Sequence, residues 1–136
     1  MSTSDAQQEL IDEFEIFDNW MDRYQYLIDM GKALPEFPDA LKTSDTRIEG
    51  CQSQVWIHEQ LEDGRLHFQA TSDAAIVSGL IAVLMRIYND RTPAEIMATS
   101  TDFLQALGLD KHLSPTRSNG LHAMLDHIYQ SARVHQ

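Results

Sequence analysis

The sequence contains very little cysteine, because Cys51 is the only thiol in 136 residues. One cysteine forms no disulfide within its own chain, which argues against a disulfide-stapled secreted protein. It also excludes an all-cysteine zinc site and an iron–sulfur cluster bound by this chain's thiolates alone. We therefore expect a protein of a reducing compartment, the cytoplasm, with no bound metal.

The sequence also lacks a long apolar run. The longest one, Ala74–Met85, is interrupted by Ser78 and Gly79 and is followed by Arg86, so it is too short to span a bilayer. No basic segment followed by an apolar one opens the sequence, and a signal peptide is therefore not expected. Both absences predict a protein without a membrane partner.

Positive charge is scarce, since 10 Lys and Arg stand against 21 Asp and Glu and the formal net charge is −11. Such a chain repels the phosphates of DNA and RNA, so we do not expect nucleic acid as a partner. Most of the acidic residues lie in the first half of the sequence. They form either a solvated helix surface that keeps the protein soluble or an acidic face that a partner recognises.

What the sequence does contain is enough apolar material for one core, 43% of its residues. At this length we expect residues 1–136 to fold as a single domain. Apolar residues recur at helical spacing through 10–17 and again through 20–28. Gly31 is expected to stand just after the end of the second of these helices.

The apolar pattern then changes to the alternation that is typical of strands. Residues 55–61 and 65–71 flank Asp63-Gly64, the dipeptide that favours a type I′ hairpin turn. A two-residue turn pairs the two strands and places one apolar set on a single face: Val55, Ile57, Leu61, Leu66, Phe68 and Ala70. Residues 46–49 are expected to add a third antiparallel strand.

Three helix-start signals follow the hairpin. Ser72 and Asp73 are expected to cap an apolar central helix that runs to Tyr88 and lies on the core face of the sheet. Residues 92–95, TPAE, form a capping box, and Ser114-Pro115 starts the last helix. The expected fold class is α+β, a small antiparallel three-stranded sheet with helices packed around one face.

The single cysteine stands at the tip of the loop that joins the expected strands, directly after Gly50. A thiol is nucleophilic only as its thiolate, which successive backbone N–H groups or a nearby guanidinium would favour. Gly50 allows unusual backbone conformations and keeps bulk away from the sulfur. The other interpretation is that Cys51 packs in the core, as lone cysteines often do.

Other chemistry has weaker support in the sequence. A Cys–His hydrolase is conceivable with any of the six histidines, but none stands at a diagnostic spacing from Cys51. His58 and His67 lie on one strand face without being directly opposite, so a metal pair is not expected there. The sequence has no glycine-rich phosphate loop, and we expect no cofactor.

Three segments together resemble a known family. Residues 50–56, GCQSQVW, resemble the signature loop of the SufE family, which are sulfur acceptors for cysteine desulfurases in iron–sulfur cluster assembly. Residues 72–77, SDAAIV, followed by 79–82, GLIA, and residues 114–121, SPTRSNGL, resemble two further family segments in the same order. The resemblance extends from about Phe14 to the last helix.

This resemblance implies a SufE/IscU-like fold and a function. Cys51 would take a persulfide sulfur from a SufS-type cysteine desulfurase, stimulate that enzyme and pass the sulfur to a SufBCD-type scaffold. The chain would then be an accessory persulfide carrier rather than a stand-alone enzyme, and a homodimer is possible. Two alternatives stay open: an acceptor for a related desulfurase outside the Suf pathway, and a non-catalytic interaction module with a structural cysteine.

The resemblance also implies roles for residues around Cys51. Arg117 would lie beside the cysteine loop and steady the sulfur's negative charge, unless it is an exposed arginine that pairs with an acid. Asp73 would cap a helix and contribute to docking. The polar residues Gln52, Ser53 and Gln54 would hold the loop by hydrogen bonds. We expect Cys51 to be largely buried at rest and the loop to move outward for transfer.

Overall fold

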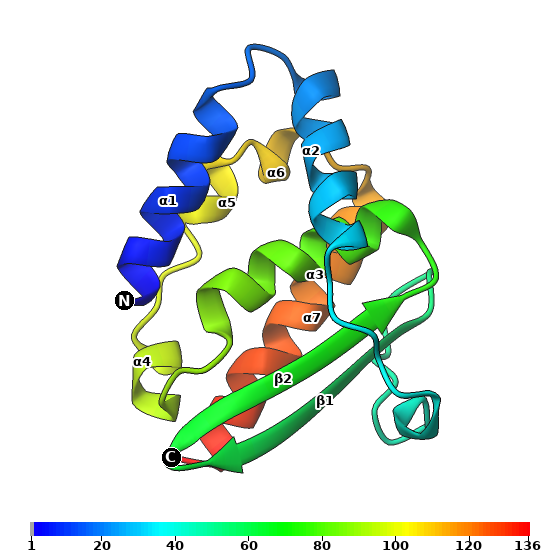
Figure 1. The fold of residues 1–136 in the computed structure, drawn as a ribbon, viewed down its shortest axis with the longest axis vertical. Coiled ribbons are helices and arrows are strands. Elements are labelled where there is room, and N and C mark those ends of the chain that lie inside the picture. The colour runs from blue at the N-terminus through cyan, green and yellow to red at the C-terminus, as the bar shows by residue number, and fades with distance from the viewer. Residues whose placement is uncertain (1) are drawn as a thin grey trace.

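The computed structural model describes residues 2–136 and shows helices packed around a two-stranded antiparallel hairpin (Figure 1). Helix α3, Ala75–Tyr88, crosses the middle of the molecule and contacts the hairpin, α1 and α2 (Figure 1). Most residues of α3 are buried, which makes it the centre of the core. Across residues 2–136, none of the helices has the length and apolar character that a membrane span requires.

The hairpin has the register that the sequence predicts. Strand β1, Val55–Glu62, pairs antiparallel with β2, Arg65–Ser72, along the whole length of both strands. The turn residues Asp63 and Gly64 have φ angles of 52° and 78°, the positive values that a type I′ turn requires. The prediction of the turn and of the strand pairing is therefore confirmed.

The expected third strand is absent from the described residues, and this prediction is wrong. Arg47 and Trp56 form only an isolated bridge, beside a hydrogen bond of 2.9 Å from the Ile48 N–H to the Val55 carbonyl. A turn around residues 43–46 precedes this segment and the left-handed Gly50 follows it. The chain between the two turns is thus too short for a ladder.

The N-terminal half supplies two helices, α1, Thr3–Glu15, and α2, Trp20–Lys32. The Ser2 hydroxyl caps α1 in a capping box with Asp5, and the Asn19 side chain caps α2. A 3₁₀ turn, η1, Asp39–Leu41, lies in the connection that leads to β1.

Two glycines bring α2 and α3 into direct backbone contact. A Cβ on Gly79 would lie 2.2 Å from the carbonyl oxygen of Leu27, and one on Gly31 would lie 2.6 Å from the Gly79 nitrogen. Because α2 ends at Lys32, Gly31 lies inside this helix rather than after its end, and our prediction for it is wrong. The reason is tertiary, because only glycine leaves room for this helix crossing.

The C-terminal half is helical: α4, Pro93–Met97; α5, Phe103–Ala106; α6, Leu109–His112; α7, Pro115–Val134. The two start signals predicted here are confirmed. Thr92 and Glu95 form the capping box of α4, and the Ser114 hydroxyl caps α7. Helix α7 buries an apolar stripe against the core: Leu121, Met124, Leu125 and Ile128.

One carboxylate lies between β1 and α7. The Glu59 side chain is 3.1 Å from the Nε2 of His127 and accepts a hydrogen bond of 2.9 Å from the Ser131 hydroxyl. Burial alone would raise the pKa of Glu59, but the bonds from His127 and Ser131 lower it below the usual range. Glu59 therefore joins β1, which begins just after the cysteine loop, to the last helix.

Candidate functional site

Gly50 turns the chain sharply before β1. Its φ of +89° lies in the left-handed region that side chains other than glycine adopt only at a cost. A Cβ added there would lie 3.4 Å from the Cβ of Ala123, an ordinary contact, so the backbone angle rather than lack of space favours glycine. This turn directs Cys51 onto α7.

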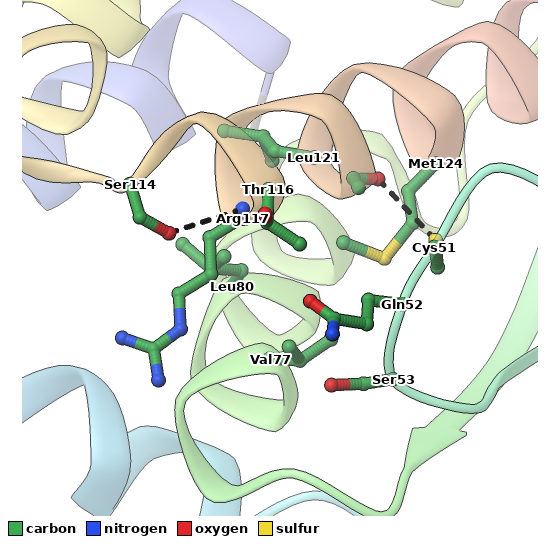
Figure 2. A pocket seen from close by; sticks show the side chains of 11 residues that line it. Cys51, Gln52, Ser53, Val77, Leu80, Ser114, Thr116, Arg117, Leu121 and Met124 are labelled. Atoms are coloured by element: carbon green, nitrogen blue, oxygen red, sulfur yellow. Dashed lines mark hydrogen bonds between the residues drawn. The ribbon is translucent and has the colours of Figure 1, made fainter.

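Cys51 packs against a second glycine, on α7. The Cys51 thiol donates to the Gly120 carbonyl oxygen at 3.6 Å (Figure 2). A Cβ on Gly120 would lie 3.6 Å from the Cys51 sulfur, an ordinary contact, so Cys51 packs directly on this turn of α7. Cys51 is only partly buried, less than the largely buried state that we expected.

A cavity of about 430 Å³ lies beside the sulfur, between the cysteine loop, α3 and α7 (Figure 2). Its apolar wall is formed by Val77, Leu80, Leu121 and Met124. Its polar residues are Gln52, Ser53, Ser114, Thr116 and Arg117. The space is large enough for a group bonded to the sulfur, and the apolar wall would limit its contact with water.

In this conformation the surroundings of Cys51 favour the neutral thiol. Burial raises the pKa of Cys51, and no charged group among the described residues offsets that rise. The contact with the Gly120 carbonyl acts in the same direction, because a carbonyl accepts a bond from S–H and repels a thiolate. Among the described residues, no positively charged side chain lies close enough to the Cys51 sulfur to favour the thiolate in this conformation.

Arg117 lines the same cavity but points away from Cys51 (Figure 2). Its guanidinium donates a hydrogen bond of 3.0 Å to the Tyr24 hydroxyl and lies 5.9 Å from the centre of the Tyr24 ring. Its partner is thus a tyrosine of α2 rather than the acid that we had considered. Arg117 and Cys51 share a cavity without touching.

Asp73 holds the end of the cysteine loop. Its carboxylate accepts a hydrogen bond of 3.0 Å from the Gln54 N–H, and its own N–H donates to the Gln54 carbonyl at 3.3 Å. The expectation that Asp73 caps α3 is wrong, because the N-cap is Ala74 and makes no side-chain capping bond. The Asp73 carboxylate is turned instead toward the loop.

The three polar loop residues differ in position. Gln52 and Ser53 line the cavity, whereas Gln54 does not. The bonds described for Gln54 use its backbone, so the expected role of these side chains in holding the loop stays a prediction.

Tyr24 is the site residue that sequence reasoning missed. It lies 93 positions from Arg117, and no local pattern relates a tyrosine in one helix to an arginine in another at that separation. Within residues 2–136, no three His, Cys, Asp or Glu side chains come together as a metal site would require.

A family comparison decides the class of protein. The family model described as SufE, Fe-S metabolism associated domain, matches residues 8–132. The chain belongs to the SufE family. Membership in SufE associates the chain with iron–sulfur metabolism.

Individual relatives agree with SufE membership. A SufE-like protein of Rhizobium meliloti, described as uncharacterized, is 40% identical over 129 residues, 91% of this chain and 92% of the relative. Another from Rhizobium etli, described in the same words, is 38% identical over 131 residues, 93% of this chain and 88% of the relative. The solution structure of a hypothetical protein from Thermus thermophilus has a similar fold, with a TM-score of 0.77 and 19% identity over 96% of this chain and 95% of that one.

Proposed function

We propose that this SufE-family protein is a sulfur carrier that accepts a persulfide sulfur on Cys51 from a SufS-type cysteine desulfurase. The observation that carries the proposal is the position of Cys51, at the edge of a cavity with one apolar wall and one polar side. A structural cysteine needs no adjoining space, whereas a sulfur acceptor needs room for the atom that it receives. Family membership adds the association with iron–sulfur metabolism.

The transfer is an exchange between sulfur atoms. The Cys51 thiolate attacks the outer sulfur of the persulfide on the desulfurase, and a new S–S bond forms as the old one breaks. The desulfurase cysteine leaves as a thiolate and takes up the proton that Cys51 gave up. No oxidant is needed, because one S–S bond replaces another.

The resting geometry requires two changes before this attack. The thiol must lose its proton, which burial and the Gly120 carbonyl oppose, and the sulfur must become accessible to the partner. The loop is tied on one side by Gln54 and Asp73 and on the other by Ile48 and Val55. An outward movement of residues 49–53 would expose the sulfur while leaving these ties intact.

Onward transfer completes the proposed cycle. A thiolate of a SufBCD-type scaffold attacks the outer sulfur on Cys51, and the Cys51 thiolate is regenerated as the leaving group. Once its sulfur is removed, the carrier can accept another from the desulfurase persulfide. Repeated removal of sulfur from the desulfurase is how the carrier would stimulate that enzyme. A desulfurase outside the Suf pathway would use the same chemistry, so the identity of the donor is a separate question.

Mass spectrometry tests the proposal directly. We would incubate the protein with a SufS-type desulfurase and cysteine, digest it and measure the peptide that contains Cys51. We expect that peptide to gain the mass of one sulfur atom and to lose it again on treatment with a thiol reductant. Protein alkylated at Cys51 beforehand is the control and should show no gain.

Two other results have defined meanings. The absence of any gain with SufS-type and other desulfurases would contradict the carrier role and favour an interaction module. A gain with a different desulfurase alone would retain the carrier role and assign the chain to the related acceptors.

A further inference from the structure

The contact between Tyr24 and Arg117 crosses from α2 to the first turn of α7 beside the Cys51 cavity. The hydrogen bond of 3.0 Å fixes one guanidinium nitrogen, and the ring lies within cation–π distance of the same group. Both side chains belong to helices, and Arg117 also lines the cavity. The contact therefore determines where the cation beside the cavity is placed.

Tyr24 is itself held in position by other rings. Trp20, one turn earlier on α2, meets the Tyr24 ring edge-to-face with centroids 6.3 Å apart. The Trp20 ring is in turn stacked on the ring of His112, with centroids 4.6 Å apart. His112 is the last residue of α6, just before α7. The Tyr24 hydroxyl is thus a fixed acceptor rather than a freely moving one.

Arg117 is the one charged side chain among the residues that line the described cavity. The wall from α3 contributes only Val77 and Leu80. Glu49 and Asp73, the carboxylates nearest in sequence to the loop and the hairpin end, are exposed and do not line the cavity. A change in the position of Arg117 is therefore the most direct way to change the charge near the sulfur.

Arg117 is also placed so that it can approach the sulfur. It precedes Gly120 by three positions on α7, and side chains at that spacing lie on the same face of a helix. The Cys51 thiol lies over Gly120. Arg117 and Cys51 line the same cavity, so a rotation of the Arg117 side chain away from α2 would turn the guanidinium into the space beside the thiol.

We infer that Tyr24 is a positioning residue, which keeps the Arg117 guanidinium on α2 and away from Cys51 until a partner engages the loop. The inference rests on the proposed function, because it assigns Arg117 to the sulfur during transfer. At rest, the thiol stays protonated and reacts slowly with oxidants and other electrophiles. During transfer, the released guanidinium would stabilise the sulfur anion.

The test is the pH dependence of Cys51 alkylation by iodoacetamide, a neutral reagent that does not itself attract the guanidinium. Tyr24→Phe keeps the ring and its contact with Trp20 but removes the acceptor of the hydrogen bond. We expect alkylation at pH 7 to be about threefold faster than in the wild-type protein, because a nearby cation raises the thiolate fraction. The midpoint of the pH profile should move to lower pH.

Two further variants make the test specific. Adding Arg117→Ala to Tyr24→Phe should cancel the gain, because the cation is then missing. Tyr26→Phe is the matched control, since it removes the hydrogen bond of another α2 tyrosine, to the Glu13 carboxylate. We expect that control to leave the alkylation profile unchanged.

The inference is overturned if Tyr24→Phe reacts like the wild-type protein, or if the double variant reacts as fast as Tyr24→Phe. The second outcome would mean that the substitution opens the cavity rather than releasing the arginine. None of these measurements uses a desulfurase. Failure of the proposed function in the mass experiment and failure of this inference are therefore observed separately.

Discussion

Each end of β1 adjoins a turn with a glycine of positive φ, but the surroundings of the two turns differ. One end continues into the Asp63-Gly64 turn and the other follows the Gly50-Cys51 loop, and both glycines have positive φ angles, 78° and 89°. A Cβ on Gly64 would meet nothing within 4 Å, whereas one on Gly50 would meet Ala123 of α7. The first turn ends in solvent and the second is pressed against a helix.

This difference separates a turn that closes a hairpin from a turn that presents a side chain. The Asp63-Gly64 turn needs only two residues with positive φ, and both of them are exposed. The loop end depends on α7, because Gly120 receives the thiol and the neighbouring residues complete the cavity. The same local conformation therefore presents a side chain to a cavity only where a distant helix packs against it.

Among substitutions at the two ends of β1, Cys51→Ser should have the largest effect on function. We expect complete loss of sulfur uptake and of desulfurase stimulation, because a hydroxyl cannot form a persulfide. The unfolding free energy should stay within about 0.5 kcal/mol of wild type, since the side chain is only partly buried. Sulfide release in the presence of a desulfurase measures the function, and retained stimulation would contradict the carrier role.

A pair of glycine substitutions compares the ends directly. Gly50→Ala and Gly64→Ala should each destabilise the fold by about 1–2 kcal/mol, because each forces a side chain into the left-handed region. Urea unfolding measures this cost.

The two variants should differ in function. Only Gly50→Ala should slow sulfur transfer from the desulfurase, because only its turn positions the thiol. Equal slowing in both variants would show that transfer follows overall stability, and the distinction between the two ends would then be wrong.

Arg117→Ala alters the surroundings of the Gly50-Cys51 loop without altering the backbone of that loop. We expect sulfur transfer to be about tenfold slower, which corresponds to roughly 1.4 kcal/mol of lost stabilisation of the sulfur anion. Stability should change little, because Arg117 is exposed. Single-turnover transfer followed by mass spectrometry measures the rate, and an unchanged rate would leave Arg117 without a role in the reaction.

The smallest effect concerns Glu59, between the two ends of β1. Because its pKa is lowered in the folded protein, its ionised form stabilises the fold above the unfolded carboxyl's pKa of about 4.3. That contribution is lost as the pH falls through the folded value. We expect wild type to be more stable than Glu59→Gln at pH 7 and the difference to shrink toward pH 3, as measured by urea unfolding at each pH.

The parts of the fold that could be predicted from the sequence depend on short-range rules. The hairpin register followed from Asp63-Gly64 and from the alternation on either side, because a two-residue turn leaves one way to pair the strands. The caps Thr92 and Ser114 were equally local. Family resemblance singled out Cys51 and Arg117, although it gave no geometry between them.

Two features that the sequence did not reveal depend on contacts between distant segments. Glycine is typical of the position just after a helix end. Gly31 lies within α2 instead, because its missing side chain leaves room for the Gly79 backbone of α3. Glu59 is a charged residue on the apolar side of β1. Its carboxylate is accommodated there because His127 and Ser131 of α7 bind it. No rule based on spacing along the chain reaches such partners.

The glycine contact between α2 and α3 has a mechanical consequence for the cavity. Backbones that touch without intervening side chains leave no room for a side chain at Gly31 or Gly79, so α2 and α3 form one close-packed frame. That frame carries Tyr24 on one helix and the wall residues Val77 and Leu80 on the other. In the proposed transfer the cysteine loop would move against this frame, and the frame would define the position to which Cys51 returns.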